Sequence, residues 1–324
     1  MTKTALQATP TVASTSADSL SSDVICIASW NADLVSRVAR PIARGETLMA
    51  HSFEIQPGGK GSNAAVAASR QGAKVGVIAR IGDDDFGRMA LALWATEGIA
   101  TQHVAVAANE RSGVAQILVF DDGDNSIAVA TGAGSALGEA NVDVACEAIR
   151  AARVVMASNE VPQSATLAAF KIARAANVKT ILNPAPAVAL PDGLIALCDV
   201  LTPNELEVRV LAGMSAEALI EDAAQALLDK GAGAVIVTLG SQGCALWQKG
   251  QLAQTLAGWA MQVVDTIGAG DTFTGALAAA LARGELLAEA ATSANAAAAL
   301  SVTGRGAIAA MPTLAQSQNL ENHH

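Results

Sequence analysis

Residues 154–183 read VVMASNEVPQSATLAAFKIARAANVKTILN, and this stretch decides the fold class. The apolar runs VVMAS (residues 154–158) and KTILN (residues 179–183) predict two buried strands, because each is short and ends in a polar residue. The Ala-rich segment between them, residues 164–176, predicts a helix. A strand, a helix and a second strand in this order form a βαβ unit, in which both strands run parallel.

The same alternation continues on both sides of this unit. Further strands are predicted near residue 24 (VICIAS), residue 200 (VLTPN) and residue 234 (AVIVTLG). Further helices are predicted over residues 141–151, 223–230, 269–283 and 286–300. The sequence therefore indicates an α/β protein with a parallel sheet and helices on both of its faces.

Three extended segments interrupt the alternation. They are residues 47–55 (TLMAHSFEI), 113–120 (GVAQILVF) and 126–130 (SIAVA), and the turn DDGDN joins the last two as a hairpin. We expect a small separate sheet, a lid, built from about residues 37–57 and 111–131.

Composition limits the possible partners. The 324 residues are 52% hydrophobic, 15% charged and 3% aromatic, which suits small aliphatic side chains packed between helices and a parallel sheet. The formal net charge of −10, without any long basic run, predicts no nucleic-acid partner and no membrane partner. An anionic ligand would therefore be held by local backbone amides and a metal ion.

The ends and the cysteines are less informative. We expect residues 23–316 to form the folded domain, with a disordered N-terminal tail (residues 1–22) and a C-terminal tail (residues 317–324). No C-x-x-C pair occurs, so we expect buried thiols in a reducing cytoplasm rather than disulfides or zinc ligands, at Cys26, Cys146, Cys198 and Cys244.

Polar clusters end five of the predicted strands. Ligands of such sheets bind at the carboxyl ends of the strands, which share one edge, so these clusters predict a single site. The clusters are SWNAD (residues 29–33), SNE (158–160), NP (183–184), TPNE (202–205) and TLGS (238–241).

The segment VDTIGAGDTFTGA, residues 264–276, carries the clearest chemical signal. Gly268, Ala269 and Gly270 form a turn at a helix start, where backbone N–H groups without intrahelical partners and the helix dipole favour an anion. Asp271, in the first turn, faces that anion and is placed to act as the base for an attacking hydroxyl. The alternative is that Asp271 only caps the helix.

The segment PGGKGSNAAVAASRQGA, residues 57–73, is a second Gly-rich helix start. Its G-x-G-x-x-A spacing fails as a dinucleotide fingerprint, because the next strand, VGVIAR, ends in Arg80 without an acid for a ribose. Gly59 and Gly61 can instead expose amides to a polyol, while Asn63 supplies a donor and an acceptor. A plain helix start is the alternative.

No Walker A pattern occurs, so a P-loop does not hold any ATP phosphates. The chain does resemble the ribokinase-like carbohydrate kinases, the phosphofructokinase-B (PfkB) family, from about residue 24 to residue 312. The motifs that carry this resemblance are, in order, SWNAD, PGGKGSNAAVAA, IGDDDFG, NPAPA, TPNELE, TLGSQG and DTIGAGDTFTGA.

The resemblance implies a doubly wound, mostly parallel α/β sheet with a β-sheet lid, and an ATP-dependent sugar kinase acting on a primary hydroxyl, with D-ribose favoured. It implies Mg²⁺, a monovalent cation (K⁺) and a homodimer formed through the lid. For the sugar, the implied ligands are Asn31, Asp33, Gly59, Lys60, Gly61, Asn63 and Glu160. The implied catalytic base is Asp271, with an anion hole at Gly268, Ala269 and Gly270.

For ATP and hydrated Mg²⁺, the resemblance implies an N-x-x-E element formed by Asn204 and Glu207. The remaining nucleotide ligands it implies are Thr238, Gly240, Ser241, Gly243, Gly270 and Asn295. For the monovalent cation, it implies Asp265, the carbonyl of Ile267, Ser301, Gly304, Gly306 and Ala310.

The chain departs from the family pattern at Ala28, Trp30, Gln116, Thr274 and Ala310. Trp30 and Gln116 could reshape the sugar pocket. The alternatives are therefore the same fold acting on a deoxyribose, a ketohexose or a nucleoside such as adenosine or pseudouridine, with Trp30 stacking on the base. A non-catalytic sugar sensor is the alternative of another class.

Overall fold

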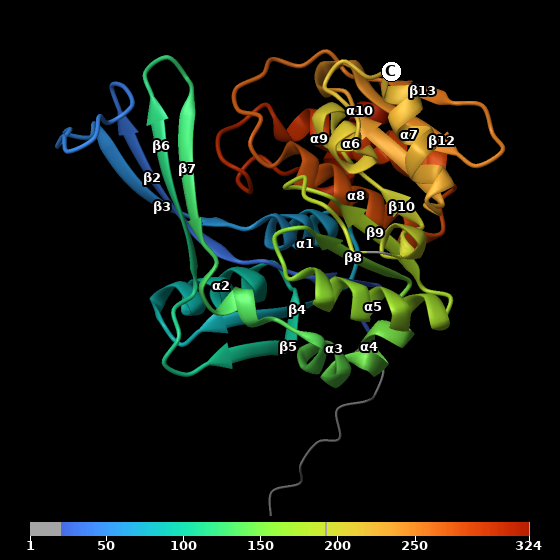
Figure 1. Cartoon of the computed structure of the whole chain (residues 1–324), viewed down its shortest axis with the longest axis horizontal. Coiled ribbons are helices and arrows are strands. Elements are labelled where there is room, and N and C mark those ends of the chain that lie inside the picture. The colour runs from blue at the N-terminus through green and yellow to red at the C-terminus, as the bar shows by residue number, and fades with distance from the viewer. Residues whose placement is uncertain (1–20, 192, 324) are drawn as a thin grey trace, which may run out of the picture.

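A large sheet forms the centre of the protein in the computed structural model, which describes residues 21–191 and 193–323 (Figure 1). Within those residues the sheet has nine strands in the order β13-β12-β11-β10-β9-β8-β1-β4-β5. Their bounds are β1 (Val24–Ile27), β4 (Val75–Gly82), β5 (Ala100–Ala107), β8 (Val154–Ser158), β9 (Lys179–Asn183), β10 (Val200–Leu201), β11 (Ala234–Thr238), β12 (Gly243–Gln248) and β13 (Gln254–Ala257). Neighbours from β5 to β11 pair parallel and β12 runs antiparallel to both of its neighbours, which confirms the predicted sheet.

Helices cover both faces of this sheet, as predicted (Figure 1). On one face lie α1 (Lys60–Arg70), α2 (Asp85–Thr96), α8 (Ala269–Arg283) and α9 (Leu287–Ser301). On the other lie α3 (Glu139–Val144), α4 (Cys146–Ala151), α5 (Gln163–Ala175), α6 (Glu205–Ala212) and α7 (Ile220–Asp229). Strand β1 is buried on both sides: Val24 and Cys26 belong to the first core, and Ile25 and Ile27 to the second.

A second sheet of four described strands, in the order β3-β2-β6-β7, projects from the α/β part as the expected lid (Figure 1). The strands are β2 (Asn31–Val38), β3 (Ser52–Gly58), β6 (Gly113–Phe120) and β7 (Asn125–Ala130). The predicted hairpin joins β6 to β7. The lid begins earlier than the predicted residue 37, because Asn31 already pairs with Gly58 in β3 and with Gly113 in β6.

Two predicted boundaries differ from the structure. The helix expected over residues 141–151 is two helices, because the chain departs from helical geometry at Ala145. Helix α10 (Leu314–Asn322) runs through most of the expected C-terminal tail, since Thr313 and Gln316 form a capping box and the buried Ser317 accepts a hydrogen bond from Gln71. Of the expected N-terminal tail, residues 1–20 lie outside the described residues.

Among the described residues, three short 3₁₀ helices connect these elements: η2 (Gly132–Ala136), η3 (Ile195–Leu197) and η4 (Gly240–Gln242). In the part of the chain that the structure describes, none of the helices has the length and apolar character needed to cross a membrane.

Candidate active site

The five polar clusters lie along one edge of the central sheet. Strands β1, β8, β9, β10 and β11 are consecutive neighbours, and all of them pair parallel, so their carboxyl ends point the same way. The lid strand β2 starts beside the end of β1, at the same edge. The sheet therefore gathers segments that are more than 200 residues apart in the sequence.

The Gly-rich loop between β3 and α1 packs directly on the backbone that follows β1. Gly59 has φ +95°, and a Cβ there would lie 2.8 Å from the carbonyl oxygen of Ser29. A Cβ at Gly61 would lie 2.6 Å from the amide nitrogen of Ser29. Both positions therefore require glycine for close packing. The sequence pattern alone does not distinguish this requirement from a role in ligand binding.

Glu160, at the end of β8, is tied to this loop. Its Oε2 accepts a hydrogen bond from the Ser29 hydroxyl at 2.8 Å and from the Lys60 backbone amide at 2.7 Å. The Ser29 hydroxyl in turn accepts one from the Gly61 amide at 3.0 Å. The carboxylate is therefore fixed beside the start of α1.

Asp271 is buried in the first turn of α8, with 4% of its surface exposed. Its Oδ2 accepts a hydrogen bond from Asn63 Nδ2 at 2.9 Å. Among the described residues, the buried Oδ1 of Asn63 has no hydrogen-bond partner. A buried acceptor without a donor is costly, so this amide oxygen is ready to receive a hydroxyl group.

The charges of the site perturb one another. Burial raises the pKa of Asp271 to about 6, although the field of Lys60 lowers it. Burial, with repulsion from Glu160 and Asp271, raises the pKa of Asp33 to about 7. The field of Asp271 in turn raises the pKa of Lys60. Such clusters of perturbed groups mark functional sites.

The N-terminus of α8 is built as the sequence predicts. Gly268 has φ +80°, and a Cβ there would lie 2.9 Å from Ala307, so this position requires glycine. At Gly270, by contrast, no described atom beyond the adjacent residues and the nearby backbone of α8 would lie within 4 Å of a Cβ. In the first turn the Ala269 amide donates to the carbonyl of Thr266 at 3.3 Å, whereas the amides of Gly270 and Asp271 have no intrahelical acceptor and face the N-terminal end of the helix. This geometry suits an anion.

A cavity of about 450 Å³ lies beside this helix start. The expected nucleotide residues that line it are Thr238, Gly240, Ser241, Gly243, Gly270 and Asn295. The sequence reasoning missed the segment from Gly258 to Met261, which lines the same cavity. The segment follows the edge strand β13 and has no motif of its own, so the printed sequence offers no signal for it.

Asn204 and Glu207 are placed differently from that group. Asn204 caps α6 by accepting hydrogen bonds from the amides of Leu206 (3.0 Å) and Glu207 (2.8 Å). Glu207 Oε2 accepts one from the Asn204 amide at 2.8 Å, which completes a capping box. The two residues are not among those lining the cavity, but the field of Glu207 reaches Lys60 and Asp271 and raises the pKa of both.

The residues expected around a monovalent cation come from two loops that the structure brings together. Asp265 accepts hydrogen bonds from the amides of Ile267 at 3.0 Å and of Gly306 at 2.9 Å. The Ser301 hydroxyl is bound to the carbonyl of Ala298 at 2.8 Å, and Gly304 packs against Ala310. In the described residues no cluster of three His, Cys, Asp or Glu side chains could hold a metal ion. The candidate ligands here are oxygens, from one carboxylate and from backbone carbonyls, and oxygens of this kind bind alkali cations.

Two departures from the family pattern are explained by packing. Trp30 is only 4% exposed, and its ring meets that of Trp94 edge-on at 5.8 Å between centroids, so it belongs to the core rather than to a base-stacking surface. Thr274 shares a hydrogen bond with Thr202 at 3.1 Å.

Gln116 is exposed on the lid. Cys146 is half-buried, whereas Cys26, Cys198 and Cys244 are buried as predicted.

Comparison with known proteins identifies the class. Residues 21–314 match the family described as pfkB family carbohydrate kinase, and the chain belongs to this family. It is 39% identical over 299 residues to a ribokinase of Haemophilus influenzae, which covers 92% of this chain and 97% of that protein. It is 34% identical over 297 residues to a deoxyribokinase of Salmonella typhi, over 91% and 97% of the two chains.

The fold agrees with this assignment. The structure matches that of Arabidopsis thaliana ribokinase complexed with ribose and ATP with a TM-score of 0.87 and 32% identity, over 93% of this chain and 99% of that one. The predicted ribokinase-like fold and the carbohydrate kinase class are therefore both confirmed.

Proposed function

We propose that this protein transfers the γ-phosphoryl group of ATP to the primary hydroxyl of D-ribose, with Asp271 as the general base. The observation that carries the proposal is the position of Asp271: it is buried, has a pKa raised to about 6, and lies in the first turn of a helix that begins with an anion-binding geometry. Relatives named ribokinase support ribose as the acceptor.

The sugar would bind between the lid and the start of α1. The Oδ1 of Asn63, buried and without a partner among the described residues, would accept a hydrogen bond from one sugar hydroxyl. Asp33 and Glu160 would supply further acceptors, and the Gly59 amide and the Lys60 ammonium group would supply donors, since the amides of Lys60 and Gly61 are bound to Glu160 and Ser29. Asn31, which is buried where β2 begins, would complete this set.

In the transfer step, the carboxylate of Asp271 accepts the proton of the primary hydroxyl as its oxygen forms a bond to the γ-phosphorus. The bond from that phosphorus to the bridging oxygen breaks, and ADP leaves with the electron pair. Amides at the start of α8 would stabilise the charge on the equatorial oxygens. The base is adjacent to this helix start, so one element positions both the acceptor and the phosphoryl group.

The nucleotide would occupy the cavity of about 450 Å³ beside α8. Phe273 and Met261 give it apolar walls suited to a flat base, while Thr238, Ser241 and Asn295 supply polar groups. The carboxylate of Glu207 suits a hydrated Mg²⁺, whose chemistry is to neutralise phosphate charge. We further propose that Asp265 and carbonyls of residues 267 and 301–306 hold K⁺, which would order the loop before α8.

We also propose a cytoplasmic homodimer formed through the lid. The lid exposes large apolar side chains on both of its faces: Phe53 (58%) and Ile55 (49%) on one, and Ile127 (56%) and Val129 (54%) on the other. Exposed apolar faces of this kind are costly in a monomer, and a second copy would cover the face that carries Phe53 and Ile55.

The first experiment measures ADP release with Mg²⁺ and ATP, with and without K⁺, across D-ribose, 2-deoxyribose, fructose, adenosine and pseudouridine. Turnover fastest on ribose and stimulated by K⁺ is the expected result. The relative named deoxyribokinase makes 2-deoxyribose the main competitor. Turnover only on adenosine or pseudouridine would contradict the proposal, and so would sugar binding without any ADP release.

The second measurement tests the base. Asp271→Asn should lower kcat by roughly 10²- to 10⁴-fold while calorimetry shows ribose still bound, because the loss of a general base affects only the transition state. Asp85→Asn is the matched control, since Asp85 is also acidic and in the first turn of a helix, but on the exposed α2. Near-normal turnover of Asp271→Asn would remove Asp271 from this role.

A further inference from the structure

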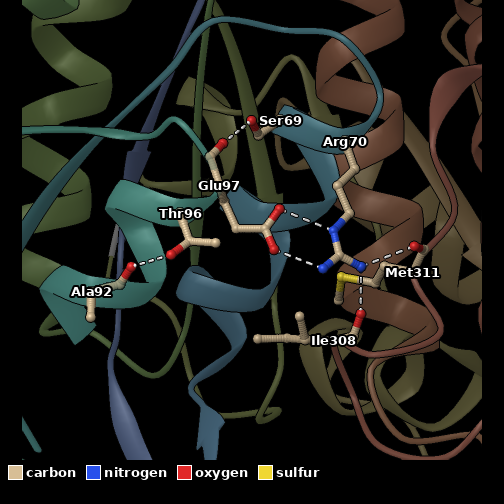
Figure 2. A network of polar contacts seen from close by, with 7 residues as sticks. All are labelled: Ser69, Arg70, Ala92, Thr96, Glu97, Ile308 and Met311. Atoms are coloured by element: carbon tan, nitrogen blue, oxygen red, sulfur yellow. Dashed lines mark hydrogen bonds and ion pairs between the residues drawn. The ribbon is translucent and has the colours of Figure 1, made fainter. Parts of the chain in front are cut away.

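Arg70, the last residue of α1, is bonded to two separate segments, at Glu97 and at residues 308–311 (Figure 2). Its Nε and Nη2 donate to the two carboxylate oxygens of Glu97 at 3.0 and 2.7 Å, in a bidentate pair. Its Nη1 donates to the carbonyl oxygens of Ile308 at 2.7 Å and Met311 at 3.1 Å. The side chains of Arg70 and Glu97 are 23% and 14% exposed, so solvent screens this pair less than a surface ion pair.

The segment held by Arg70 leads back to the proposed anion hole. Ile308 follows Ala307, which lies against Gly268 so closely that a Cβ at Gly268 would be 2.9 Å away. Two residues earlier in the chain than Ile308, the amide of Gly306 donates to Asp265. The segment 304–311 is thus fixed on one side by Arg70 and, on the other, rests on the loop that carries Asp265 and begins α8.

The segment 304–311 itself has little regular structure to hold it in place. It lies between α9 and α10 and is made of turns and bends. Irregular backbone of this kind needs external hydrogen bonds to keep a single conformation, because each ordered residue costs conformational entropy. Arg70 supplies two such bonds, and its carboxylate partner fixes the guanidinium.

We propose that Arg70, oriented by Glu97, is a positioning residue for the monovalent-cation site: it fixes the segment 304–311 from behind and so sets the cation affinity. This inference rests on the cation site of the proposed function. Arg70 does not touch the reacting groups; it acts through Ile308 and Met311 on the neighbouring Gly306 and Ala307. The neighbouring Gln71 holds the chain just after this segment, because its side-chain amide donates to the carbonyl oxygen of Pro312.

The test compares Arg70→Met with Arg80→Met. Arg80 is a matched control because it also makes a bidentate pair, with Glu110 at 2.7 and 2.6 Å, and donates to one carbonyl, that of Ala133, at 2.7 Å. The concentration of KCl for half-maximal effect is measured twice on each full-length protein. One readout is the rate of ADP release, and the other is the rise in Tm without nucleotide or sugar, with choline chloride keeping the ionic strength constant.

For Arg70→Met, both half-maximal K⁺ concentrations should rise by about 10-fold or more, the usual effect of removing a group that supports metal ligands. Hydrogen exchange of the amides of residues 304–311 should accelerate as well. Glu97→Gln, which keeps the shape of the partner, should shift both K⁺ constants in the same direction by less. Arg80→Met should lower Tm and leave both K⁺ constants unchanged.

Two negative outcomes are distinguishable. If wild-type protein responds to K⁺ and Arg70→Met responds at the same concentrations, Arg70 is merely structural and the inference is overturned alone. If wild-type protein shows no K⁺ effect on either rate or Tm, the proposed cation site is wrong, and the inference falls with it. Equal shifts in Arg70→Met and Arg80→Met would also overturn it, because the effect would then report general loss of stability.

Discussion

Replacing Gly270 by alanine should separate stability from turnover. Apart from the adjacent residues and the nearby backbone of α8 itself, no described atom would lie within 4 Å of the added Cβ. Gly270 is the second residue of α8, and its φ is not positive. Alanine in a helix is favoured over glycine by about 0.5–1 kcal/mol, so the variant should be at least as stable as wild type. For a chain of this size that gain corresponds to a rise in Tm of about 1–2 °C.

Turnover should move in the opposite direction. The methyl group would occupy the open space over the first-turn amides, where the oxygens of the transferred phosphoryl group must come close to the backbone. Loss of a single such donor typically costs about 10²- to 10³-fold in kcat, and we expect at least the lower figure. Thermal melting gives the stability and coupled ADP release gives kcat, while calorimetry with ribose checks that the sugar site is intact.

Gly134→Ala is the control, because a Cβ at Gly134 would make only an ordinary contact, 3.7 Å from the carbonyl of Arg80. It should leave kcat unchanged. A Gly270→Ala protein with wild-type kcat would refute the reasoning, since phosphoryl oxygens could not then approach the backbone at this residue. A large fall in Tm would refute it differently, by showing that the space above the helix start is not open.

Two further predictions concern charge and assembly. Because burial raises the pKa of Asp271 to about 6 and a base must be ionised, kcat/KM for ribose should rise with a single ionisation between about pH 5 and pH 7; a flat profile would contradict the assignment. The raised pKa also makes stability depend on pH. The contribution of Asp271 to the free energy of unfolding is fully present below the unfolded pKa and is lost as pH rises through 6, because the buried carboxyl must then ionise. Asp271→Asn should therefore show a weaker loss of stability over that range. For the lid, Phe53→Glu should convert a dimer to a monomer in light scattering, whereas Leu252→Glu, at an even more exposed apolar residue on the β12–β13 turn (91% against 58%), should not.

The fold was predictable because the same strand–helix–strand pattern recurs along the sequence. Each βαβ unit combines a short apolar run with an amphipathic or Ala-rich helix, and the periods differ enough to be told apart. The predicted helix of residues 269–283 coincides with α8 (Ala269–Arg283), where Gly268 and Gly284, both left-handed, mark the two ends. The lid start was misjudged because SWNAD looks like the polar end of a strand, whereas Asn31 begins a new strand by pairing on both sides.

The site was predictable only where a residue's chemistry is local. Asp271 and the glycines before it announce themselves by their spacing, since a helix start and its acid are neighbours in the sequence. The interpretation of Trp30 as a residue that could stack on a base failed, because nothing in the sequence shows that its ring packs against that of Trp94 in the core. Arg70 gives no signal either: its partners Ile308 and Met311 offer backbone carbonyls, which every residue has.

The electrostatics of the site support the proposed place of Lys60 beside the sugar rather than on a phosphate. Three carboxylates, Asp33, Glu160 and Asp271, repel one another in a largely buried volume, and repulsion adds to burial in raising the pKa of Asp33 and Asp271. Lys60 lowers the pKa of both Asp33 and Asp271, and the field of Asp271 is in turn the largest cause of the raised pKa of Lys60. Without this ammonium group the pKa of Asp271 would rise further toward neutrality, and a larger share of the molecules would hold the base protonated and inactive. Sugar hydroxyls, being neutral donors, can satisfy the same carboxylates without adding charge. The field of Lys60 therefore lowers the pKa of the proposed base, and under the proposed function a sugar hydroxyl would supply the hydrogen bond that the buried Oδ1 of Asn63 lacks among the described residues.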